Sequence, residues 1–291
     1  MPPLSEIAAF LRPYTAEPLI AALCAATALL YFRGLSRGEP PGNWAIAGFI
    51  VGLGSMYLVT QTRFDYFAQY LFFMHRVQHL VLHHVGPMLI VLANPLPILV
   101  RALPERPRHR AQSLWHSAPI SVLYKSIQHP APAGFLFVGL IYFWLIPSIH
   151  FDAMLSRFQY NLMNWTMAVD GILFWWLVLN PRAPDGANGS LGYGKRCLLL
   201  ALVMFPQILI GAYIALSDSA AYGIYEVCGR PWPIQSDTDQ TLAGLITWIP
   251  ASMMSVVGML IVLSRWQRHE RAQNGGPDGT GGRISTVGGR M

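Results

Sequence analysis

Four histidines lie within one long apolar run of the sequence, which extends from residue 66 past Pro87. They are His75, His79, His83 and His84. The first three are four residues apart, so on a helix with about 3.6 residues per turn they form one continuous stripe that drifts by about 40° per step. Neutral imidazoles on one face can share a metal ion, and imidazole suits copper, zinc, iron or nickel. The stripe therefore predicts a metal site.

The alternative is that these histidines only form hydrogen bonds to neighbouring helices and hold a bundle together. A polar group inside lipid is costly unless it is paired or coordinated, and three such groups at a regular spacing favour a function. A zinc peptidase is excluded, because its HExxH motif needs Glu as general base where this chain has Arg76. Arg76 is expected to repel or meter an incoming metal ion, or to pair with an outer carboxylate such as Asp65.

Other apolar runs offer further ligands and supporting groups. His150 lies at the outer end of one run, and Asn164 lies in the next. Met163 and Met167 are spaced i, i+4 in that same run, and thioethers bind Cu(I) well, although methionine is also a common packing residue. Asp170, near mid-membrane, should be protonated or paired, and one option is a place behind a histidine ligand.

Asp239 and Gln240 stand directly before the last apolar run, at the outer start of the last helix. These two residues are expected to cap the helix that starts there, or to guide the ion towards the histidines.

The elements that position these residues follow from composition. Of the 291 residues, 53% are apolar and only 12% are charged, which is about half the charge of a soluble domain. A membrane span needs about 20 mostly apolar residues. Seven such runs occur, at residues 17–33, 43–61, 66–93, 131–149, 159–180, 196–217 and 241–264. The sequence therefore predicts an all-α, polytopic membrane protein with seven transmembrane helices.

The remaining segments are short. Pro87, near the end of the third run, predicts a kink or an early stop there. The segment 94–130 contains AQSLWHSAPISVLYKS, which predicts a short interfacial helix. Residues 1–265 form the transmembrane domain, and the polar, glycine-rich residues 266–291 predict a disordered cytoplasmic tail.

The basic residues set the expected orientation. The net charge is +6, but the Lys and Arg side chains fall in short loops, which excludes a nucleic-acid-binding face. Of these 20 residues, 15 fall in one set of alternate loops and 4 in the other, while Arg76 lies inside a span. Because positive loops stay in the cytoplasm, we expect the N-terminus outside and the C-terminus in the cytoplasm.

Three motifs resemble the CtaG family of cytochrome c oxidase assembly factors. MHRVQHLVLHHVGPMLIVLANP matches the family's His-x-x-x-His pair at His75 and His79, with its prolines at Pro87 and Pro95. DQTLAGLITWIP at 239–250 resembles the Asp-Gln-x-x-Ala-Gly motif, and GILFWW at 171–176 is a weaker match. Where the family often has two further histidines, this chain has Asn164 and Leu145. His83, His84 and His150 are candidates to replace them as ligands.

The resemblance implies a bacterial inner-membrane protein that assembles a haem-copper oxidase, with oxidase subunits, membrane lipid and periplasmic copper donors as partners. The expected function is transient copper binding and delivery to the oxidase catalytic subunit, with no chemical step on a substrate and so no enzyme activity. Two alternatives stay open. One is a membrane haem protein that carries electrons, with His150 as the mate of a histidine in the stripe. The other is a copper transporter.

Overall fold

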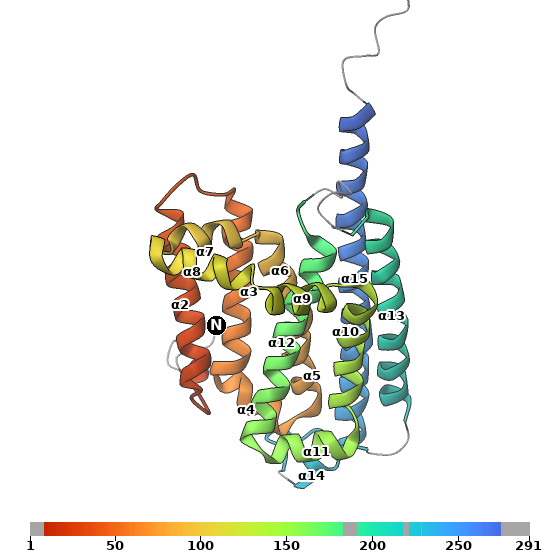
Figure 1. Cartoon of the computed structure of the whole chain (residues 1–291). Coiled ribbons are helices and arrows are strands. Elements are labelled where there is room, and N and C mark those ends of the chain that lie inside the picture. The colour runs from red at the N-terminus through yellow and green to blue at the C-terminus, as the bar shows by residue number, and fades with distance from the viewer. Residues whose placement is uncertain (1–8, 183–190, 218–220, 228, 275–291) are drawn as a thin grey trace, which may run out of the picture.

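The computed structural model describes residues 9–182, 191–217, 221–227 and 229–274 (Figure 1). Within these ranges every regular element is a helix. Five helices are long and apolar enough to cross a membrane. They are α2 (Pro18–Leu35), α3 (Asn43–Gln61), α12 (Arg157–Leu179), α13 (Tyr193–Leu216) and α15 (Ser236–Asn274). Two bent helix pairs bring the number of candidate spans to as many as seven. The prediction of an all-α, multi-pass membrane protein is confirmed at this level.

The first bent pair contains the histidine run, which is not the single helix predicted for 66–93. The chain forms α4 (Arg63–Tyr70), breaks at the extended residue Leu71, and continues as α5 (Phe72–Leu80), η1 (Val81–Val85) and α6 (Gly86–Ala93). Asn94 then adopts a left-handed conformation with φ 47°, and α7 (Leu96–Ala102) leaves at an angle of 67°. Pro95 contributes to this bend, because the residue before a proline is disfavoured in the helical conformation.

The second bent pair replaces the predicted span 131–149. Helix α10 (Pro130–Trp144) ends before α11 (Pro147–Leu155), which is tilted by 74°. Ile146 is extended, at φ −62° and ψ 121°, as expected for a residue that precedes a proline. The bend places His150 on a short helix of its own, across the end of the bundle from α14 (Ile224–Val227) (Figure 1).

The structure changes two further predictions, one about the segment 94–130 and one about the C-terminal tail. The segment 94–130 contains two short helices beyond α7, which are α8 (Glu105–Trp115) and α9 (Ala118–Ile127), and both lie across one end of the bundle (Figure 1). The last helix continues to Asn274, so residues 266–274 of the predicted disordered tail are helical. The rest of that tail, 275–291, lies outside the described residues.

The histidine run occupies the middle of the bundle. Helix α15 packs against α13 and α5, α3 packs against α6, and α12 packs against η1 and α6. Gly171 of α12 permits the close approach to η1, since a Cβ atom there would lie 2.5 Å from the His83 carbonyl oxygen. Backbone packed this closely leaves no room for lipid or bulk water around the histidines.

Candidate metal site

The histidine run contains one π-helical turn, η1, directly before Pro87. Proline has no backbone N–H, so the usual donor to the His83 carbonyl is missing, and its ring crowds that carbonyl. The π-turn accommodates this defect: Gly86 N–H bonds to Val81 O instead. The side chain of Trp175 then donates to His83 O at 3.2 Å. The predicted kink at Pro87 is thus a change of helical pitch, and the helix continues to Ala93.

The π-turn divides the predicted stripe into two pairs of rings. His75 and His79 lie together on α5, with ring centroids 4.4 Å apart. His83 and His84 form the second pair on η1, at 4.9 Å. A π-helical turn holds about one residue more than an α-helical turn, which changes the direction of the side chains that follow it. His83 therefore does not continue the line formed by His75 and His79.

His150 joins the first pair from α11. Its ring centroid lies 5.1 Å from that of His75, edge to face. His150 Nδ1 is 3.0 Å from Trp144 O, and its Nε2 is 2.9 Å from the Tyr225 hydroxyl. Because a carbonyl only accepts, Nδ1 must carry the proton, and Nε2 must accept from Tyr225. Both nitrogens of His150 therefore have partners.

The other four histidines are buried with incomplete hydrogen bonding. Side chains within the described residues leave five of their ring nitrogens without a partner: both of His75, Nε2 of His79, and Nδ1 of His83 and of His84. The exposed fraction of each of these residues is 3% or less. An unsatisfied buried polar group costs about 1–3 kcal/mol, and such groups in native proteins commonly mark a site for water or an ion.

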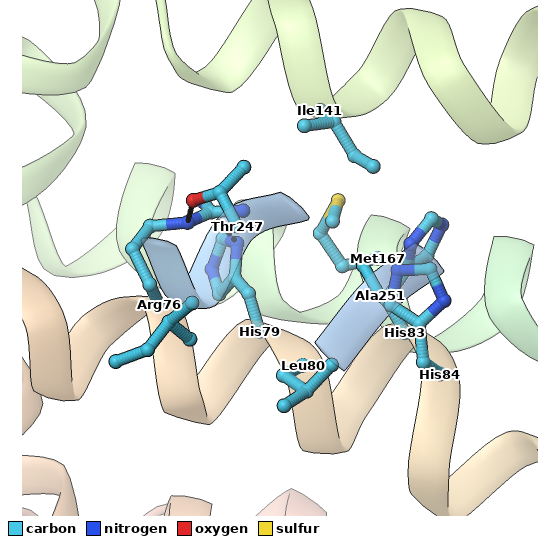
Figure 2. A pocket seen from close by; sticks show the side chains of 10 residues that line it. Arg76, His79, Leu80, His83, His84, Ile141, Met167, Thr247 and Ala251 are labelled. Atoms are coloured by element: carbon cyan, nitrogen blue, oxygen red, sulfur yellow. Dashed lines mark hydrogen bonds between the residues drawn. The ribbon is translucent and has the colours of Figure 1, made fainter. Parts of the chain in front are cut away.

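A small cavity of about 10 Å³ lies between His79 and the pair formed by His83 and His84 (Figure 2). That volume holds about one water molecule. Figure 2 shows Arg76 and His79 at one end of the cavity, His83 and His84 at the other, and Met167 between them. Met167 therefore faces the imidazoles, as a soft ligand would.

The two remaining residues predicted on this part of α12 do not line this cavity. Met163 packs in the apolar core beside Phe72 and Ile141. Asn164 is buried at 4% exposure, its side chain lies close to His79, and it also lines an apolar groove.

Arg76 is a buried cation, and the predicted pairing with Asp65 is wrong. Arg76 Nε donates to Thr247 Oγ1 at 2.9 Å, and Nη1 lies 3.4 Å from His79 Nδ1. No carboxylate among the described residues forms an ion pair with Arg76. Because a guanidinium only donates, His79 Nδ1 is the unprotonated nitrogen and Nε2 carries the proton.

Asp65 is held by four other side chains instead. Tyr160 donates to it at 2.7 Å, and the further donors, at 2.7–3.0 Å, are Gln69, Thr15 and Gln78. Burial raises the pKa of Asp65, while the hydrogen bonds oppose that rise. This network joins the N-terminal segment to α4, α5 and α12, and it ends at Tyr160, whose ring centroid lies 6.0 Å from that of His75.

Asp170 lies behind a histidine. Its Oδ2 atom is 3.0 Å from His83 Nε2, and the exposed fractions of the two side chains are 9% and 1%. His83 also stacks on Phe137, with ring centroids 4.1 Å apart. These contacts fix the direction of the imidazole and leave only Nδ1 of His83 without a partner.

Asp239 caps a helix, although not the one expected. Its two carboxylate oxygens accept from the backbone N–H groups of Phe72 and Phe73, at 3.1 and 2.8 Å. Those groups begin α5, where Leu71 offers no side-chain cap. Gln240 accepts from Ala221 N at 2.9 Å, so it ties the chain that follows α13. Neither residue lines the small cavity beside the histidines.

Replacing Asp239 with alanine should therefore destabilise the fold by about 1–2 kcal/mol, because it removes a cap and leaves two N–H groups of α5 unsatisfied. Asp237 lies two residues earlier, is exposed, and serves as the matched control. Thermal unfolding in detergent should show a lower Tm for D239A and an unchanged Tm for D237A. Equal Tm values would contradict the capping role.

Several residues of the site carry no signal in the sequence. Tyr225 and Tyr222 come from the polar segment between α13 and α15, yet Tyr222 packs on Phe72, with the two rings tilted and their centroids 4.1 Å apart. Burial raises the pKa of Tyr222 to about 12, so the hydroxyl stays protonated and donates to Leu145 O at 2.9 Å. Thr247 and Phe137 lie in ordinary apolar runs. Of these residues, only Thr247 could have been singled out from the sequence, because it is a polar residue inside an apolar run.

The described residues contain no group of three or more His, Cys, Asp or Glu side chains already arranged to hold a metal ion. Tyr225, Arg76 and Asp170 each engage one histidine nitrogen. A metal ion would have to displace at least one of these contacts, or use those nitrogens that have neither a partner nor a proton, together with Met167.

Comparison with known proteins identifies a family. A model of the family described as cytochrome c oxidase caa3 assembly factor (Caa3_CtaG) matches residues 28–269. An uncharacterized protein of Mycobacterium leprae is 22% identical over 282 residues, which cover 93% of this chain and 42% of that protein. An uncharacterized protein of Mycobacterium bovis is 24% identical over 283 residues, with the same two shares. The chain thus spans less than half the length of these relatives. No solved structure matches it significantly.

Proposed function

The chain belongs to the cytochrome c oxidase caa3 assembly factor family, and on that premise we propose that it assists oxidase assembly by binding copper at the buried histidines and passing it to the oxidase catalytic subunit. The observation that carries this proposal is the group of five buried histidine nitrogens without partners, three of which belong to residues that line one small cavity. Packing alone does not account for so many unsatisfied groups in one place.

Copper fits the chemistry of these side chains. Imidazole and thioether groups are ligands for copper, and thioethers favour Cu(I). His75 and His79 would hold the ion, and the cavity lined by Met167, His83 and His84 would offer further ligands. His150 would contribute only after it releases the Tyr225 hydroxyl.

The arrangement supports transient binding more than storage. Arg76 places a positive charge beside His79 and holds its Nδ1 in the acceptor state. Both effects oppose a cation at His79, so the ion would be held weakly enough to leave. A carrier that delivers its cargo needs this property, and no chemical step on a substrate is required.

The cavity argues against the haem alternative. A volume of about 10 Å³ accommodates one water or one ion, whereas a haem needs a wide slot between two facing ligands. The transporter alternative gains no support of its own, because the described histidines on the central helix end at His84.

The proposed setting is the bacterial inner membrane, since the mycobacterial relatives are bacterial. With the N-terminus outside, α5 would begin near the outer face, and copper would arrive from periplasmic donors. The proposed partners are oxidase subunits.

A titration tests the proposal directly. The chain, purified in detergent, is titrated with Cu(I) under reducing conditions against a coloured chelator, and bound metal is measured per chain. We expect one equivalent of copper to bind, with a visible spectrum that shows no Soret band. Absence of copper at saturation would contradict the proposal and leave an assembly factor that acts by contact alone.

A further inference from the structure

A second cavity lies beside the histidine run, between it and α2. It is an apolar groove of about 240 Å³ between α2, α3, α6 and α12. Residues of all four helices and of α7 line it, among them Leu23, Cys24, Phe49, Ile90, Leu99 and Ala168. Helix α2 packs against α3 and α7, and the groove occupies the space that α2 leaves towards α12.

The groove is long and narrow. Along α3 its lining extends from Phe49 to Thr60, which at 1.5 Å per residue is about 16 Å, or roughly half the hydrocarbon layer. An extended hydrocarbon chain is apolar along its whole length, as a lining of this kind requires.

Three arginines follow the groove residues at the end of the groove near the α6–α7 bend. Arg33 and Arg37 follow the last groove residue of α2, and Arg101 follows Leu99 of α7. Arg101 donates to Gly34 O and Glu39 O, and Arg37 donates to Ala102 O. We call Arg33, Arg37 and Arg101 the arginine group.

The arginine group lacks a counter-charge of its own. None of its members forms an ion pair with a carboxylate among the described residues. Arg101 Nη2 also has no hydrogen-bond partner there. Glu39 is the acidic residue of this segment, while α8, at the same end of the bundle, adds further arginines (Figure 1). These are Arg106, Arg108 and Arg110.

We propose that the groove binds one acyl chain of an anionic phospholipid, with the phosphate at the arginine group. Apolar cavities of this kind do not hold water, and acyl chains are the material that surrounds a membrane span. The positive end of the groove selects a headgroup with net negative charge, since each Lys or Arg near an anionic membrane surface contributes about 1 kcal/mol.

Native mass spectrometry of the purified chain tests this proposal. Phosphatidylglycerol and phosphatidylcholine with identical acyl chains are added separately, and the fraction of chain that retains one lipid is compared. We expect phosphatidylglycerol to be retained in preference. Equal retention of the two lipids would overturn the role of the arginine group.

Paired variants separate the headgroup from the acyl chain. R33Q should weaken phosphatidylglycerol retention about fivefold, the factor that about 1 kcal/mol represents, while R268Q, an equal charge change on α15 far from the groove, should not. L23W fills the groove and should reduce the retention of both lipids. L29W alters an exposed residue of the same helix outside the groove and should change neither.

Two outcomes would contradict the proposal. If L23W and L29W retain lipid equally, the lipid is bound at the general surface and not in the groove. If a polypeptide stays with the purified chain and L23W releases it, the groove is a docking site for a helix of another protein.

Discussion

Replacing both His75 and His79 with alanine should abolish stoichiometric copper binding. Their rings lie 4.4 Å apart, and three of their four nitrogens have no partner among the described residues. Removal of two imidazoles takes away the ligands nearest to each other, and the thioether of Met167 cannot hold the ion alone. The measurement is the amount of Cu(I) bound per chain at saturation, determined by competition with the coloured chelator.

The matched control replaces His109 and His129 with alanine. Both are exposed, on α8 and directly before α10, so the change in composition is the same while the cavity stays intact. This control should bind copper as the unmodified chain does. The H75A, H79A chain should remain folded, because the substitutions remove unsatisfied polar atoms, and its circular dichroism and Tm check this.

If the folded H75A, H79A chain still binds a full equivalent of copper, the copper site does not include His75 and His79. The remaining candidates would then be His83 and His84 on η1, with Met167. Loss of copper in the H109A, H129A control would instead indicate adventitious binding at the surface.

The helices could be predicted well where their ends depend on local chemistry. The runs 17–33 and 43–61 correspond to α2 and α3, because apolar stretches bounded by glycine and proline leave few alternatives. The break at Leu71 could not be predicted in this way. The α5 helix begins at Phe72 because Asp239, 167 residues away, accepts its first N–H groups, and contacts at that separation leave no local pattern.

The candidate site, too, has features that the local sequence predicts and features that depend on distant contacts. The buried histidines and Asp170 are visible by residue type, since ionisable groups in apolar runs are rare. The grouping of the histidines into two pairs depends on the π-helical turn η1. That turn forms because Pro87 has no N–H for the His83 carbonyl, to which the Trp175 side chain donates instead. Tyr225, which engages His150, lies in a polar loop where a tyrosine is unremarkable in sequence.

Replacing Arg76 with methionine should strengthen copper binding about thirtyfold. At an effective dielectric constant of about 20, a positive charge placed about 7 Å from a bound ion would oppose binding by about 2 kcal/mol, which is roughly thirtyfold in affinity. The substitution also frees His79 Nδ1, which Arg76 now occupies at 3.4 Å. The fold should not be weakened, because a buried cation without a carboxylate partner is costly to maintain.

The conservative variant R76K separates charge from shape. It keeps a cation near His79, so its affinity for Cu(I) should stay close to that of the unmodified chain, whereas R76M should bind more tightly and release copper to the chelator more slowly. Weaker binding by R76M would show that Arg76 holds an anion that accompanies the metal. If all three chains bind equally, the charge of Arg76 does not act on the ion, and rapid release must arise from the contacts of His83 and His150 instead.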